Sequence, residues 1–118
     1  MPYRTVAKEE IRRCVVRHSV FIARVREVAD EAAVRRFLAE VKAAEPAADH
    51  HCYAYRLGDQ GQFAHSSDGG EPAGTAGRPI LGALVAAGVT NAMVVVTRYF
   101  GGRKLGIPGL AEAYRSAA

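Results

Sequence analysis

A glycine-rich basic segment, residues 98–110, has the clearest chemical potential in this chain of 118 residues. It contains two arginines, one lysine and four glycines, and no acidic residue. Arginine binds phosphate with a two-pronged guanidinium, lysine binds it as a point charge, and glycine-rich turns present backbone N–H groups to anions. The predicted members of a phosphate or RNA site are Arg98, Tyr99, Gly101, Gly102, Arg103, Lys104 and Gly106. The alternative is a tight turn whose glycines only satisfy the backbone, because the segment matches neither a Walker A nor a Rossmann motif.

A second glycine-rich segment, residues 66–77, is acidic. Its Asp68 and Glu71 are candidates to coordinate Mg²⁺ or to act as acid and base, and Thr75 is a candidate cap for a helix that begins near Pro79. The alternative is a solvated loop in which Asp68 holds a turn and Thr75 only caps. We predict that this loop lies opposite the basic segment across one cleft, with Asp68, Glu71, Gly74, Thr75, Gly77 and Arg78 as its candidate residues.

The run His50-His51-Cys52 suggests a metal site, but its spacing argues against one. In a strand, His51 and Cys52 face opposite sides, and zinc needs more ligands than a chain with four histidines offers nearby. We therefore predict no metal and no other cofactor. His51 and Tyr53 are candidates for the strand beside the cleft. Nothing next to Cys52 marks it as a nucleophile with a lowered pKa.

Composition indicates one globular domain, with 49% hydrophobic residues and a net charge of +4. Residues 1–27 and 78–118 each carry a net charge of +4, whereas residues 59–77 carry −3. This pattern is consistent with RNA, a ribosome or a phosphorylated ligand as partner, and a basic surface without a partner is the alternative. No apolar run reaches about 18 residues and no signal pattern opens the chain, so we expect a cytoplasmic protein without a membrane span.

Hydrophobic periodicity predicts the elements that position these residues. Four segments are predicted as strands, residues 12–16, 19–28, 51–57 and 93–96, the last of them central and covered on both faces. Helices are predicted after Asp30, from about Pro79 to Gly88, and at the end of the chain. Residues 58–77 are expected to be turn and loop. The order β-β-α-β-α-β-α implies an α+β fold, a two-layer α/β sandwich of about four strands with helices on the sheet.

Several motifs together resemble the IMPACT family, which includes the YigZ-like proteins. The matching segments include Phe21-Ile22-Ala23, His51-Cys52-Tyr53-Ala54-Tyr55-Arg56-Leu57-Gly58, Gly70-Glu71-Pro72-Ala73-Gly74-Thr75-Ala76-Gly77-Arg78-Pro79 and Arg98-Tyr99-Phe100-Gly101-Gly102. The resemblance implies the fold of ribosomal protein S5 domain 2. It also implies that residues 1–118 are a single N-terminal domain without the ferredoxin-like C-terminal domain of bacterial relatives. Three residues depart from the family pattern: Val20, Gly69 and Pro108.

The resemblance further implies a function in translation. Eukaryotic relatives regulate translation by protein–protein binding, and bacterial relatives are discussed as nucleic-acid or ribosome binders. Our leading hypothesis is a non-catalytic binding module in translation or stress regulation that binds RNA, a ribosome or a regulatory protein at the charged cleft. The alternative is an enzyme that holds a phosphorylated small molecule with Arg98 and Lys104 and uses Glu71 or Asp68 as base or metal ligand. Gly69 counts against this alternative because it replaces the second acidic residue of the family motif.

Overall fold

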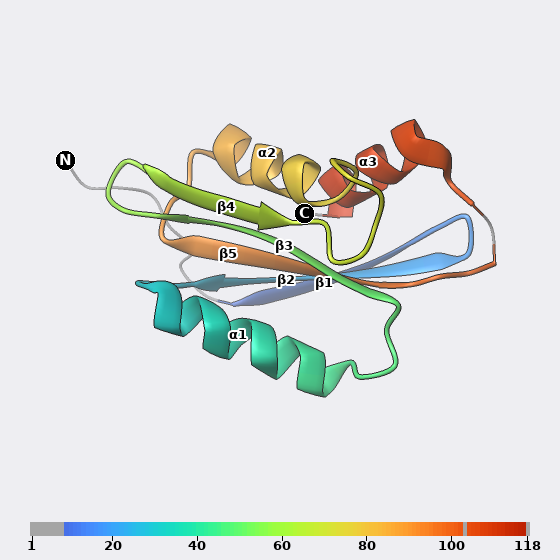
Figure 1. Ribbon diagram of the computed structural model, residues 1–118, viewed down its shortest axis with the longest axis horizontal. Helices are drawn as coiled ribbons and strands as arrows, with labels where there is room; N and C mark the ends of the chain where they lie inside the picture. The colour runs from blue at the N-terminus through green and yellow to red at the C-terminus, as the bar shows by residue number, and fades with distance from the viewer. Residues whose placement is uncertain (1–8, 103, 118) are drawn as a thin grey trace.

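The centre of the molecule is one five-stranded antiparallel sheet with the strand order β1-β2-β5-β3-β4 (Figure 1). The computed structural model describes residues 9–102 and 104–117, with only the backbone of residues 107 and 108. The strands are β1 (Glu10–Val16), β2 (Ser19–Glu27), β3 (His50–Leu57), β4 (Phe63–Ser67) and β5 (Ala92–Tyr99). Together with three helices, this sheet confirms the predicted α+β class.

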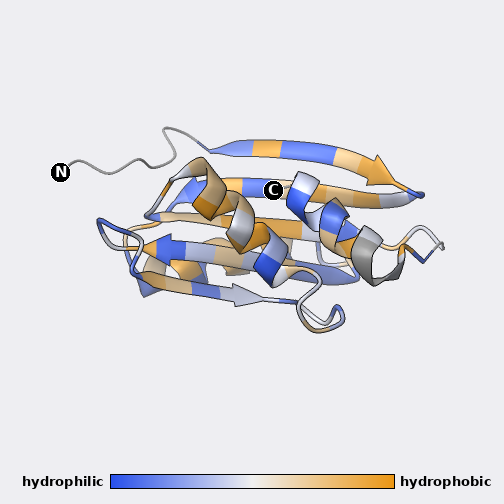
Figure 2. Ribbon diagram, turned by 90° about the horizontal axis from the view of Figure 1, so that it is seen from above, coloured by the Kyte–Doolittle hydropathy of each residue, from blue (hydrophilic) through white to orange (hydrophobic). Residues whose placement is uncertain are grey.

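The helices lie on both faces of the sheet. Helix α1 (Glu31–Ala44) covers one face, and α2 (Gly77–Ala87) and α3 (Gly106–Ala117) lie side by side on the other (Figures 1 and 2). The molecule thus has one layer more than the two-layer sandwich expected from the element order, because the order alone does not say which face a helix covers. In the described part of the chain, no helix is both long enough and apolar enough to cross a membrane.

Strand β5 explains why both faces need cover. Ala92, Val94 and Val96 belong to the hydrophobic core under α2 and α3, whereas Met93 and Val95 belong to a second core under α1. Since successive side chains of a strand point to opposite faces, a strand that is apolar at every position must be buried on both sides. The predicted central strand covered on both faces is therefore confirmed.

Strand β4 lies in the segment that we expected to be loop. Phe63–Ser67 pairs with β3, from Leu57 opposite Phe63 to Tyr53 opposite Ser67. It is an edge strand whose side chains are exposed or half-buried, so its sequence shows no alternation that periodicity could detect. The prediction of about four strands therefore falls one short. The position of β4 matters for function because its end leads directly into the acidic loop.

Helix α1 begins and ends as its sequence predicts. Asp30 is the N-cap, and its Oδ1 accepts a hydrogen bond of 2.8 Å from the backbone N–H of Ala33. The apolar stripe of the helix buries Val34, Phe37 and Val41 against the sheet. The helix ends at Ala44, shortly before Pro46.

Candidate functional site

The two glycine-rich loops meet beside α3 and line one pocket of about 390 Å³. The acidic loop contributes two residues, β3 contributes one, and β5 with the basic segment and the start of α3 contributes the others. The lining residues are His50, Glu71, Pro72, Arg98, Phe100, Lys104, Leu105, Gly106 and Leu110. This volume lies within the range of small-ligand sites. The structure thus brings the two loops together, although only some of the predicted residues face the space between them.

Glu71 and Arg98 form a buried ion pair at the base of this pocket. Arg98 Nη1 donates to Glu71 Oε2 over 2.7 Å, and the two side chains are 6% and 4% exposed, respectively. The hydroxyl of Tyr114, from α3, donates to the same carboxylate oxygen. Burial raises the pKa of Tyr114, so the phenol stays protonated and acts as a donor. Glu71 and Arg98 were expected on opposite sides of a cleft, but their side chains are in direct contact.

Arg98 has further contacts that hold its guanidinium inside the protein. Its Nε and Nη2 donate to Ser19 Oγ over 3.4 and 3.2 Å. The guanidinium carbon also lies 5.6 Å from the ring centroid of Phe21 and 5.5 Å from that of Phe100. A predicted phosphate ligand thus has intramolecular partners instead. Lys104 also lines this pocket and is exposed.

His50 joins the pocket from β3, although sequence reasoning had selected its neighbour. Its Nδ1 lies 3.0 Å from the carbonyl oxygen of Gly69, and its Nε2 lies 3.5 Å from Glu71 Oε1. The strand register places His50 directly opposite Arg98. Sequence reasoning also missed Ser19 and Tyr114. The sequence could have indicated His50 as a site residue. Alternate side chains of a strand lie on the same face, so His50 shares a face of β3 with the buried Cys52.

Asp68 does not line the pocket but organises the start of α2. Its Oδ1 accepts hydrogen bonds from the backbone N–H groups of Ala76 and Gly77 over 3.2 and 2.9 Å, and its Oδ2 accepts one from Gly74 over 3.0 Å. Burial by itself raises the pKa of Asp68, but the three N–H groups stabilise the carboxylate and bring the pKa below its usual value. Asp68 is therefore a structural carboxylate that ties the acidic loop to the helix.

The predicted cap at Thr75 is wrong. The N-cap of α2 is Ala76, which makes no side-chain capping bond, and the hydroxyl of Thr75 donates to the carbonyl of Pro72. Asp68 supplies the capping acceptor from outside the helix. Arg78, in the first turn of α2, is exposed and is not among the described residues that line the pocket.

The glycines of the basic segment have backbone roles. A Cβ atom on Gly101 would lie 2.1 Å from the carbonyl oxygen of His18, so only glycine permits this close approach of two loops. The N–H of Gly101 donates to Ser19 Oγ over 3.2 Å. Gly102 and Gly106 have φ angles of +85° and +75°, which glycine adopts without strain. Arg103, predicted as part of this site, lies outside the described residues.

Three predicted site residues lie on the α1 face of the sheet, away from the pocket. The Nδ1 of His51 lies 3.0 Å from Thr97 Oγ1, the hydroxyl of Tyr99 donates to Glu45, and Tyr53 packs against the core under α1. The prediction that His51 and Cys52 face opposite sides is confirmed. The alternation that separates those two residues also separates His51 from the pocket.

Cys52 is buried and unreactive in this environment. Its thiol donates to the carbonyl oxygen of Asp68 over 3.0 Å, and burial raises its pKa to about 12. A thiol that stays protonated is a poor nucleophile. Across residues 9–102 and 104–117, no group of three or more His, Cys, Asp or Glu side chains could hold a metal ion.

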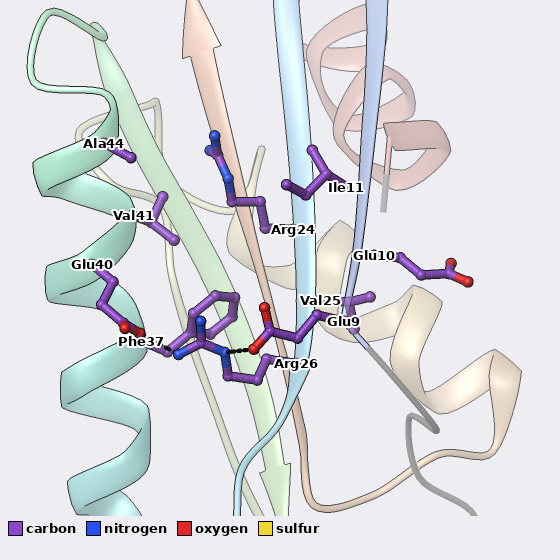
Figure 3. Close-up of a pocket in the computed structure, with 10 residues that line it drawn as sticks. All are labelled: Glu9, Glu10, Ile11, Arg24, Val25, Arg26, Phe37, Glu40, Val41 and Ala44. Atoms are coloured by element: carbon purple, nitrogen blue, oxygen red, sulfur yellow. Dashed lines mark hydrogen bonds and ion pairs between the residues drawn. The ribbon is translucent and has the colours of Figure 1, made fainter.

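A second pocket, of about 210 Å³, lies between α1 and strands β1 and β2 (Figure 3). The guanidinium of Arg26 lies over the ring of Phe37 in this pocket. It forms ion pairs with Glu9, at 2.5 Å, and with Glu40. Arg24 also reaches an acid, because its Nη2 donates to Glu45 over 2.8 Å. These cations are neutralised by neighbouring acids, so the pocket at the glycine-rich loops is the stronger candidate.

The fold and the site define a class of protein, an antiparallel α+β domain in which two glycine-rich loops enclose a ligand-sized pocket above a buried Glu–Arg pair. The family model for the Impact N-terminal domain matches residues 17–118. The chain therefore belongs to the IMPACT family, which confirms the resemblance drawn from its motifs.

Relatives and solved structures agree with this assignment. The chain is 45% identical over 104 residues to the IMPACT family member in pol 5′region of Thermus thermophilus, covering 88% of this chain and 55% of the relative. It is 43% identical over 101 residues to the IMPACT family member YigZ of Escherichia coli, covering 84% and 50%. The chain thus spans about half the length of these curated relatives.

Two solved structures share the fold. A crystal structure described as a hypothetical protein superposes with a TM-score of 0.92 at 37% identity, covering 98% of this chain and 57% of the other. The structure of the two-domain translational regulator Yih1 superposes with a TM-score of 0.61 at 26% identity, covering 98% and 48%.

Proposed function

We propose that this chain is a non-catalytic RNA-binding module that acts in the regulation of translation, and hence in the cytoplasm, through the pocket between its two glycine-rich loops. The translational context is supported by membership of the IMPACT family and by the similarity to the two-domain translational regulator Yih1. RNA as ligand is supported by the side chains at the mouth of the pocket, and a ribosomal surface would present the same chemistry.

The observation that carries the proposal is the exposed ring of Phe100 at the same pocket as the exposed cation of Lys104. Phe100 is 49% exposed although it lines the pocket, and the exposed Lys104 lies on the same rim. Aromatic side chains stack on unpaired bases of single-stranded RNA, and lysine neutralises the phosphates between them. This pocket therefore offers one surface on which a base could stack and one cation for a phosphate.

The β1–β2 turn extends this surface. Gly101 lies against the backbone of His18, and both Arg17 and His18 are exposed. The turn therefore adds positive charge next to Phe100. Because Arg17 and Lys104 are exposed and Arg98 is buried, we expect phosphate contacts from Arg17 and Lys104 and none from Arg98.

Filter-binding titrations against tRNA and ribosomes, repeated across a salt series, test the proposal. We expect affinity to fall as salt rises, since bound phosphates release counterions. Phe100→Ala should weaken binding by about tenfold through the lost stacking. Lys104→Ala should weaken it and reduce the salt slope by about one unit.

Two matched variants control for surface changes in general. Phe63 is 65% exposed at the opposite end of the sheet, and Lys42 is exposed on α1, so Phe63→Ala and Lys42→Ala should bind as the wild type does. Absence of RNA and ribosome binding, or binding that is insensitive to salt, overturns the proposal. Capture of a protein partner that survives nuclease treatment would favour protein docking instead.

An enzyme that acts on a phosphorylated small molecule receives less support from the geometry. Its phosphate ligand would be Arg98, whose guanidinium is paired with Glu71 and Ser19, and its base or metal ligand would be Asp68, whose oxygens are bonded to backbone N–H groups. Thermal-shift screening against nucleotides and phosphosugars with Mg²⁺ would reverse this ranking if one metabolite gave a large, selective stabilisation.

The β1–β2 turn yields a separate prediction that couples stability to binding. Arg17 and His18 have φ angles of 47° and 69°, a left-handed conformation that Asn-Gly adopts with little strain in a two-residue hairpin. The double variant Arg17→Asn/His18→Gly should gain about 1–2 kcal/mol in free energy of unfolding. It should also bind RNA more weakly, with a salt slope lower by about one unit. Thermal denaturation and filter binding on one preparation measure both, and unchanged RNA affinity would exclude the turn from the interface.

A further inference from the structure

Two hydrogen-bond acceptors converge on the pocket. Oε2 of Glu71 is used by Arg98 and Tyr114, whereas Oε1 accepts no hydrogen bond from residues 9–102 and 104–117. The carbonyl oxygen of Gly69 can only accept, so the hydrogen of a neutral His50 ring is on Nδ1. In this uncharged tautomer Nε2 is an acceptor that lies 3.5 Å from Glu71 Oε1, and the two groups form an ion pair only when the ring is protonated. A ligand group that donates two adjacent hydrogen bonds would satisfy both atoms.

The walls of the pocket suit a flat ring. Pro72, Leu105 and Leu110 supply apolar surface, and Phe100 supplies an aromatic ring that is half exposed. The guanidinium of Arg98, 5.5 Å from the centroid of Phe100, helps to fix the orientation of that ring. The exposed Lys104 lines the same pocket and could contact a phosphate carried by the ribose of a bound nucleotide.

Among the nucleobases, guanine matches this arrangement. Its pairing edge carries a ring N–H and an exocyclic amino group side by side, which are two adjacent donors. Adenine and cytosine pair one amino donor with a ring acceptor, and uracil flanks one N–H with two carbonyls, so each would place an acceptor against Glu71 or His50. A buried acceptor that faces another acceptor is left without a hydrogen bond. Such a site therefore discriminates strongly against the three other bases.

We infer that the pocket binds one guanine base, with its pairing edge on Glu71 Oε1 and His50 Nε2 and its ring against Phe100. The base can come from an unpaired position in RNA or from a free guanine nucleotide, since both present the same edge. In its RNA form this inference rests on the proposed function, for which it supplies the base preference.

The test compares ligands that differ by one group. Short oligouridines carrying a single central guanosine, inosine, adenosine or cytidine are titrated against the protein by fluorescence polarisation, and GMP, IMP and AMP are titrated by calorimetry. Inosine lacks only the exocyclic amino group of guanosine. We expect guanosine to bind about tenfold more tightly than inosine and more tightly still than adenosine or cytidine.

Two histidine variants separate recognition from folding. His50→Ala removes one acceptor at a side chain that is 24% exposed, and the ratio of guanosine to inosine affinity should fall toward one. His65→Ala changes an exposed histidine on β4 and should leave that ratio unchanged. Because the ratio is measured within each variant, a general loss of stability does not mimic the expected result.

The outcomes distinguish this inference from the proposed function. Equal affinity for all four oligonucleotides overturns the guanine pocket while RNA binding stands. Binding of GMP over IMP without binding of any oligonucleotide supports the pocket with a free nucleotide as its source, and overturns the RNA-binding proposal. No binding of any oligonucleotide or nucleotide overturns both.

Discussion

Replacing Arg98 with methionine is expected to lower the free energy of unfolding by about 3–5 kcal/mol, because it leaves the buried carboxylate of Glu71 without its counter-charge. The two groups lie 2.7 Å apart and are almost fully buried. Glu71→Leu should cost a similar amount, because it leaves the guanidinium uncompensated. Urea denaturation followed by circular dichroism measures both changes, and unchanged m-values would show that the native state kept its compactness.

The double variant Glu71→Leu/Arg98→Met provides the sharper result. With both charges removed, the loss should be well below the sum of the single losses, since no ion remains buried alone. The exposed pair of Arg115 and Glu112, 3.9 Å apart on α3, is the matched control, and Arg115→Met should change stability by less than about 0.5 kcal/mol. Additive losses, or an Arg98→Met loss no larger than the control, would contradict a coupled buried pair.

Much of the fold could be predicted because its signals are local. The spacing of Val34, Phe37 and Val41 and the cap at Asp30 predict α1, and the run from Met93 to Val96 predicts a strand buried on both faces. β4 could not be predicted, because its pairing with β3 stabilises an edge whose side chains are mostly exposed. The face that each helix covers also depends on contacts between distant segments.

The candidate site was predictable in place but not in detail. The glycines and charges of the two loops indicate where ligand and backbone come close, and these loops do border one pocket. The partner of each charge depends on strand register, which sets His50 opposite Arg98 and so places His50, Glu71 and Arg98 together. Charged residues in a loop were expected to face a ligand, whereas Arg98 and Asp68 mainly bind other parts of the protein.

Replacing Asp68 with alanine is the second change with a large expected effect. The variant should lose about 2–4 kcal/mol in free energy of unfolding, because it leaves the N–H groups of Gly74, Ala76 and Gly77 without their charged acceptor. Asp68→Asn retains one carbonyl oxygen and should lose about half as much. Asp68→Ala should also weaken ligand binding at the pocket indirectly, because Asp68 ties the acidic loop that carries Glu71 to α2. Denaturation curves for both variants measure the losses.

The effect of pH separates the charge of Asp68 from its shape. Its pKa in the folded state is below the ordinary value of 3.8, so folding favours the ionised form and the carboxylate contributes stability above that value. This contribution is lost as pH falls below 3.8 through the lower folded-state pKa. The difference in stability between wild type and Asp68→Ala should thus be constant near neutral pH and shrink in strong acid. Asp59 lies at an exposed turn, so Asp59→Ala should have almost the same stability as the wild type both near neutral pH and in strong acid. A difference that persists unchanged in strong acid would mean that Asp68 acts through packing, because a protonated carboxyl no longer holds the helix N-terminus as an anion.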